Sequence, residues 1–142
     1  MGKQKILVSA CLLGECCAYD GGHRFCEAVA RLGERYECVS ICPESVGGLP
    51  TPRVPSERCA QRVISKDGID VTDEYQRGAE AALALALSEK VAFAVLKAKS
   101  PSCGKGEIYD GSFTRKLVPG NGVAAELLLS RQIPVYTEKE IE

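Results

Sequence analysis

Short, nearly continuous apolar runs recur along the chain, and turn residues separate them. They occupy residues 5–10, 36–41, 91–97 and 133–137. Runs of this kind are typical of strands that are covered on both faces of a parallel sheet. The pattern therefore predicts four strands in the core of the protein.

Segments with helical character lie between these runs. Residues 23–34 carry apolar side chains at helical spacing, residues 72–90 include an Ala- and Leu-rich stretch, and residues 121–131 form the last expected helix. Residues 98–120 are expected to form a loop. The alternation of strands and helices favours an α/β fold. We expect one Rossmann-like, three-layer domain over residues 1–142, with a mostly parallel sheet and helices on both faces.

Turn-forming residues dominate the middle of the chain. Residues 43–59 hold four prolines and two adjacent glycines, which predicts a long loop. A long loop in a compact domain is more often functional than idle. Residues 62–65 and 69–72 are interpreted as a hairpin with Asp67-Gly68 as its turn.

Charge and hydropathy narrow the class of partners. The 142 residues include 18 basic and 19 acidic side chains, giving a formal net charge of −1. This balance does not favour a nucleic-acid or membrane surface. The apolar runs fall well short of the roughly 20 residues that a membrane span needs, and the N-terminal one is too short for a secretory leader. We therefore expect a cytoplasmic protein.

Cysteine is the most informative residue type in the chain. There are eight cysteines and no CxxC pair, which weakens a zinc-ribbon or ferredoxin interpretation. Cys11, Cys42 and Cys103 stand apart, because each follows an apolar run where Gly or Pro residues begin. Strand ends of an α/β sheet meet at one edge, where open folds place ligands. The three thiols are candidates for joint metal or cluster ligation, and a nucleophilic cysteine or simple burial remain the alternatives.

The other five cysteines are interpreted mainly as small apolar residues. Cys26 falls in a predicted helix, Cys38 lies within a strand, and Cys59 closes the Pro-rich loop. Cys16 and Cys17 follow Cys11 closely, so a structural role and access to the same site both remain open.

Polar residues accompany the three strand-end cysteines. Glu44 follows Cys42 and could act as a general acid or base, or simply cap backbone N–H groups. Ser100 and Ser102 flank Pro101 and could either join the site or stabilise the turn. Arg53 could clamp a planar polar substrate or remain solvated.

Taken together, these loops resemble a bacterial family catalogued as domain of unknown function 523, whose characterised relatives are thiouracil desulfurases. Seven sequence words carry the resemblance, in family order over nearly the whole chain. They are VSACLLG at 8–14, YDG at 19–21, CPE at 42–44, GGLPTPR at 47–53, SPSCG at 100–104, IYDGSF at 108–113 and PGNGV at 119–123.

The resemblance implies a [4Fe-4S] cluster held by Cys11, Cys42 and Cys103, with the fourth iron left open. It implies a non-redox desulfuration in which this iron binds and polarises the sulfur of a thiocarbonyl base such as 2-thiouracil, releasing uracil and sulfide. Glu44 and a serine, preferably Ser100, would move protons. In aerobically prepared protein the cluster is expected to be lost or replaced.

The resemblance also bounds the partners. It implies a small thiolated pyrimidine as substrate, without separating base, nucleoside and nucleotide. We expect no nucleic acid and no membrane, and the oligomeric state stays open. The alternatives are desulfuration of another thioamide metabolite and a non-catalytic module that binds metal or sulfide. Ala18 and Cys16 depart from the family pattern, which bears on substrate contacts in that loop.

Overall fold

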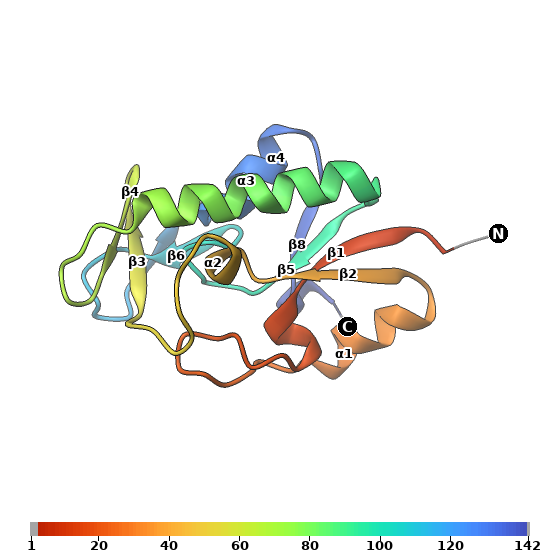
Figure 1. Ribbon diagram of the computed structural model, residues 1–142, viewed down its shortest axis with the longest axis horizontal. Coiled ribbons are helices and arrows are strands. Elements are labelled where there is room, and N and C mark those ends of the chain that lie inside the picture. Colours follow the sequence, from red (N-terminus) through yellow and green to blue (C-terminus); the bar gives the residue numbers. More distant parts are fainter. Residues whose placement is uncertain (1–2, 142) are drawn as a thin grey trace.

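The computed structural model describes residues 3–141, and a four-stranded parallel sheet forms its centre (Figure 1). The sheet has the order β2-β1-β5-β8, with β1 at Lys5–Ser9, β2 at Glu37–Ile41, β5 at Ala94–Leu96 and β8 at Val135–Thr137. The four predicted core strands are confirmed with shorter bounds.

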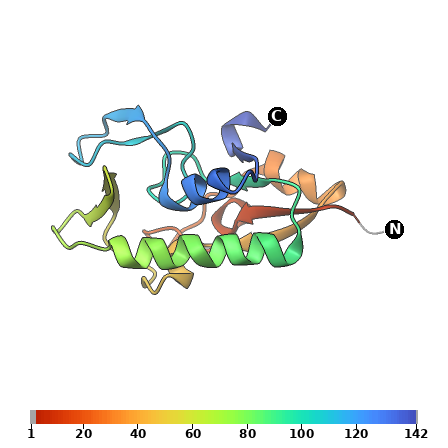
Figure 2. The same cartoon turned by 90° about the horizontal axis from the view of Figure 1, so that it is seen from above.

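Helices cover both faces of this sheet, as the α/β pattern predicts. α3 (Thr72–Glu89) and α4 (Val123–Ser130) lie over one face, and α1 (Glu27–Arg31) lies over the other (Figures 1 and 2). Successive residues of a strand point to opposite faces. Leu7 accordingly packs with α3 and α4, while its neighbours in β1 pack toward α1.

The helix predicted over residues 23–34 begins later than expected, because residues 23–26 are not helical. Residues before α1 are extended, because the backbone N–H groups of Arg24 and Cys26 donate to carbonyls of the 3₁₀ turn η1 (Ala10–Leu13). A second 3₁₀ turn, η2 (Leu32–Glu34), ends the helical segment.

The predicted hairpin in the middle of the chain is confirmed in part, and the structure adds a strand to it. β4 (Arg62–Ser65) is bridged to Asp70 through Ile64, and backbone hydrogen bonds join Ser65 to Ile69 and Val71 to Val63 around the Asp67-Gly68 turn. On its other side β4 pairs with β3 (Ser56–Cys59), which was not predicted. The residue that connects β3 and β4, Ala60, has a φ of 54°, a conformation that alanine rarely adopts, so no turn signal marks this connection.

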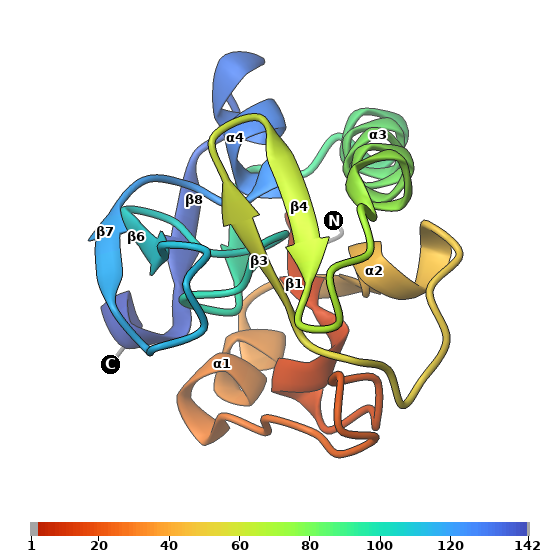
Figure 3. The ribbon, with the colours of Figure 1, turned by 90° about the vertical axis from the view of Figure 1, so that its left-hand side faces the viewer.

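Both stretches predicted as loops contain regular structure. The Pro-rich segment holds the short helix α2 (Pro43–Val46) as well as β3. Residues 98–120 hold a second hairpin of β6 (Glu107–Tyr109) and β7 (Leu117–Pro119), and the described chain ends in η3 (Glu138–Glu140). The two hairpins stand beyond one end of the sheet (Figure 3). Across residues 3–141, no helix combines the length and apolar character that a membrane crossing requires.

Candidate active site

The chain leaves two neighbouring strands, β1 and β5, in opposite directions. From β1 it passes over the α1 face to β2, and from β5 it passes over the α3–α4 face to β8. In open α/β sheets such a divergence forms a ligand crevice outside the carboxyl ends of the strands. A cavity of about 440 Å³ lies at this point, lined by the segments that follow β1, β2 and β5 and by parts of both hairpins.

The turn after β1 brings Cys11 to this cavity. η1 ends at Gly14, whose φ of 99° lies in the left-handed region that favours glycine. The backbone N–H of Arg24 donates to the Cys11 carbonyl at 2.9 Å and fixes the turn. Burial, with a further contribution from Cys42, raises the pKa of the half-buried Cys11 thiol to about 11.

The start of α2 positions Cys42. Pro43 opens the helix, and the Ser45 hydroxyl donates to Cys42 Sγ at 3.3 Å. α2 approaches α3 closely because glycines stand at the contact. A Cβ on Gly78 would lie 1.9 Å from the carbonyl oxygen of Pro43, and a Cβ on Gly47 would lie 2.1 Å from the backbone of α3. The position of Cys42 therefore depends on this pair of glycines.

The N-terminus of α4 holds the loop that carries Cys103. The N–H groups of Val123 and Ala124 donate to the carbonyls of Pro101 and Ser102, each at 2.8 Å. These bonds satisfy helix N–H groups that would otherwise lack a partner. Cys103 is 4 % exposed, and burial raises the pKa of its thiol to about 12.

A carboxylate and two hydroxyls form a hydrogen-bonded row beside these thiols. Ser102 Oγ donates to Glu44 Oε2 at 3.0 Å, whereas Ser100 Oγ is 3.5 Å from the same oxygen. The two serine hydroxyls are 3.1 Å apart. Ser100 Oγ also accepts the N–H groups of Ser102 and Cys103, which directs its own proton toward Ser102 or Glu44. Ser102 thus makes the closer contact with Glu44.

Arg53 reaches the same carboxylate from the Pro-rich segment. Its Nε and Nη2 atoms each lie 2.8 Å from Glu44 Oε1. The Arg53 side chain is 6 % exposed and that of Glu44 is 13 % exposed. Arg53 is therefore shielded from solvent, and its charge faces Glu44.

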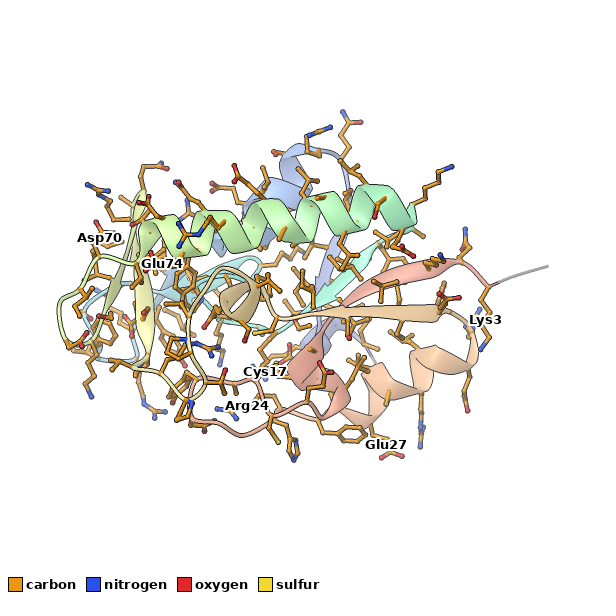
Figure 4. The ribbon with its side chains drawn as sticks, in the orientation of Figure 1. Lys3, Cys17, Arg24, Glu27, Asp70 and Glu74 are labelled. Atoms are coloured by element: carbon orange, nitrogen blue, oxygen red, sulfur yellow. The ribbon has the colours of Figure 1, made fainter. Side chains whose placement is uncertain are left out.

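Tyr75 and Cys17 also line the cavity. Tyr75, on α3, is buried, and both burial and the Glu44 carboxylate raise the pKa of its hydroxyl. Sequence reasoning missed Tyr75, because a tyrosine in the first turns of a helix carries no functional signal. Burial, followed by Cys42 and Cys11, raises the pKa of the Cys17 thiol to about 12. Figure 4 shows Cys17 and Arg24 in the loop below α2.

The remaining cysteines lie outside the cavity lining. Cys26 and Cys38 are half-buried and pack against the apolar cluster between the sheet and α1, as expected. Cys16 and Cys59 are exposed, so Cys59 is not the small buried residue that the sequence suggested. Of the pair that follows Cys11, the structure brings only Cys17 to the site.

The donor set fits an iron–sulfur cluster better than a single ion. Within residues 3–141, no three Cys, His, Asp or Glu side chains are grouped closely enough to hold one metal ion. Cysteines that ligate a cluster bind separate iron atoms, so they can stand further apart around a larger group. Cys11, Cys42 and Cys103 line one cavity from three different strand ends, as ligands of such a larger group would.

Comparisons with known proteins assign the chain to a family. A family model described as 2-thiouracil desulfurase matches residues 6–140. An uncharacterized protein of Bacillus subtilis, YbbK, is 38 % identical over 146 residues, covering 96 % of this chain and 97 % of YbbK.

A solved structure is similar over nearly the whole fold. It is that of the [4Fe-4S]-dependent thiouracil desulfidase TudS, with a TM-score of 0.91 and 45 % identity. The similarity covers 97 % of this chain and 93 % of the TudS chain. The predicted α/β class is confirmed by this match.

Proposed function

Because this chain belongs to the 2-thiouracil desulfurase family, we propose that it removes sulfur from a thiolated pyrimidine with the help of a [4Fe-4S] cluster. The reaction converts a 2-thiouracil-like compound and water into the corresponding uracil and hydrogen sulfide. The observation that carries the proposal is the meeting of three strand-end thiols and a hydrogen-bonded carboxylate in one cavity.

Cys11, Cys42 and Cys103 would hold the cluster. They come from the ends of β1, β2 and β5, and TudS, to which the chain is 45 % identical, is [4Fe-4S]-dependent. Three protein ligands leave one iron available as a thiophilic Lewis acid toward the thiocarbonyl sulfur. Cys17 is a fourth thiol in the same cavity and is not needed for this arrangement.

Glu44 and the two serines would manage the protons of the reaction. Water that adds to the thiocarbonyl carbon must lose a proton, and Glu44 Oε2 is an acceptor held in place by its neighbours. The departing sulfur must gain protons, and the hydroxyls of Ser100 and Ser102 can pass them along the row. Ser102 shares this role with Ser100, because its contact with Glu44 is the shorter one.

The remainder of the cavity suits a flat polar ring. Tyr19, Tyr109 and Phe113 supply aromatic surfaces in its lining. Aromatic side chains pack favourably against the faces of other rings. A small thiolated pyrimidine is therefore the substrate class that we propose, in preference to an aliphatic thioamide.

Anaerobic reconstitution tests this function. The protein is loaded with iron and sulfide, and its iron content and visible absorbance are recorded before incubation with 2-thiouracil. Uracil and sulfide in equal amounts support the proposal. A loaded protein that turns over an aliphatic thioamide but no thiopyrimidine would indicate the other substrate class, and a loaded protein without any turnover would indicate a binding module.

A further inference from the structure

Arg53 directs its whole guanidinium at protein atoms. Besides the two contacts with Glu44 Oε1, Nη2 donates to the Cys17 carbonyl at 3.0 Å. Nη1 donates to the Pro50 carbonyl at 3.1 Å and to the Thr51 hydroxyl at 3.0 Å. An arginine has five N–H donors. Four of them make hydrogen bonds to protein oxygens, and Nη2 is also in ion-pair contact with Glu44, so the guanidinium is directed mainly at the protein.

The contact with Arg53 determines which oxygen of Glu44 faces the site. Arg53 occupies Oε1, and Oε2 is left toward Ser102 at 3.0 Å and Ser100 at 3.5 Å. Burial acts to lower the pKa of Arg53, but the charge and hydrogen bond of Glu44, with smaller contributions from Cys42 and Tyr75, together leave the pKa raised. The guanidinium is therefore a permanent charge against one side of the carboxylate.

Arg53 also joins two segments of the cavity wall. Its backbone N–H donates to the Tyr19 carbonyl at 2.7 Å, next to the side-chain contact with Cys17. One residue thus ties the loop after η1 to the segment that carries Cys42 and Glu44.

We propose that Arg53 is a positioning residue for the desulfuration: it turns Glu44 Oε2 toward the serine hydroxyls and holds the Cys17 loop against α2. This inference rests on the function proposed above for the same cavity. Arg53 acts through Glu44, because its guanidinium pairs with Oε1 of that carboxylate and not with the serine hydroxyls.

A double-mutant cycle separates positioning from general support of the fold. Arg53→Ala and Arg53→Lys are made in the wild-type and in the Glu44→Gln background, and all are loaded anaerobically. In the wild-type background, Arg53→Ala should lower kcat about 100-fold, because a small misplacement of a reacting group has an effect of this size. KM should change less than about threefold. In the Glu44→Gln background the further loss should be less than about threefold, since groups that act as a unit are not additive.

Two further variants sharpen the test. Arg53→Lys should retain part of the activity, because an ammonium can pair with Glu44 but cannot reproduce the planar fork of contacts. The Arg53→Lys variant remains informative even if Arg53→Ala does not fold. Arg31→Ala is the matched control. Arg31 lies outside the cavity lining and makes an exposed ion pair with Glu27 at 2.9 Å, so its removal should leave kcat near the wild-type value.

Equal losses of kcat in both backgrounds would overturn the positioning role. Added guanidinium should restore part of the activity of Arg53→Ala, and a complete absence of this rescue would also overturn the role. If the wild-type holoprotein turns over no thiopyrimidine, the proposed function fails.

The unfolding midpoints of the same proteins then decide whether Arg53 orients Glu44. If Arg53→Ala lowers the midpoint less in the Glu44→Gln background than in the wild-type background, the orientation is supported, and an equal drop in both backgrounds overturns it.

Discussion

Among the eight cysteines, Cys103 and Cys38 offer a clear contrast at the scale of single residues. Cys103 is buried and faces the cavity, whereas Cys38 is half-buried and packs between the sheet and α1. Cys103→Ala should abolish stable loading with a [4Fe-4S] cluster, because two thiolates hold it less firmly than three. Cys38→Ala should load like the wild type. Iron and acid-labile sulfide assays on the reconstituted proteins check both expectations, and full loading of Cys103→Ala would remove it from the ligand set.

Glu44 is predicted to act on protons and not on the cluster. Glu44→Gln keeps the shape of the side chain but removes the basic oxygen that faces Ser102, so we expect kcat to fall about 100-fold or more with cluster content unchanged. Steady-state assays of anaerobic protein measure the loss. Glu80→Gln, on the exposed side of α3, is the control for a neutralised carboxylate. Unaltered turnover in Glu44→Gln would assign the proton transfers elsewhere.

At the scale of elements, the contact between α2 and α3 governs the site. Gly78 allows the α2 backbone to approach so closely that even one methyl group has no space. Gly78→Ala should therefore push α2 away, destabilise the fold by about 1–3 kcal/mol, and weaken cluster loading through Cys42. Gly33→Ala is the matched control, since a Cβ there meets no atom within 4 Å. Denaturant unfolding and iron content are the measurements, and a Gly78→Ala protein that matches Gly33→Ala in both would contradict the expectation.

At the scale of the whole molecule, a cluster would join the ends of β1, β2 and β5. A group that binds only the folded chain stabilises it by mass action, by about 3 kcal/mol when present at 100 times its dissociation constant. For a chain of this size the shift in Tm is about 5–10 °C. Calorimetry before and after anaerobic removal of iron by a chelator measures it. A Tm that does not change would show that the three strand ends are held together without the cluster.

The sequence was sufficient for the parallel core, because buried strands leave continuous apolar runs and helices leave periodic patterns. It was insufficient for the pairing of β4 with β3. The Asp67-Gly68 signal is local and correct, but pairing of β4 with β3 depends on Ala60 in an unfavourable conformation that only the surrounding structure can stabilise. The short helix α2 was likewise missed, because the prolines around it obscure a segment that is held by its contact with α3.

By itself, the sequence determined the fold class, the strand-end positions of Cys11, Cys42 and Cys103, and the family, because these follow from local patterns and from words that stand in order along the chain. Only the tertiary structure decided that Arg53 is paired with Glu44, that Ser102 is nearer to that carboxylate than Ser100, and that Cys17 shares the cavity while Cys16 does not. The physical reason is that hydrogen bonds and ion pairs between residues far apart in the chain depend on distances that must be right to within a few tenths of an ångström, and no local pattern encodes them.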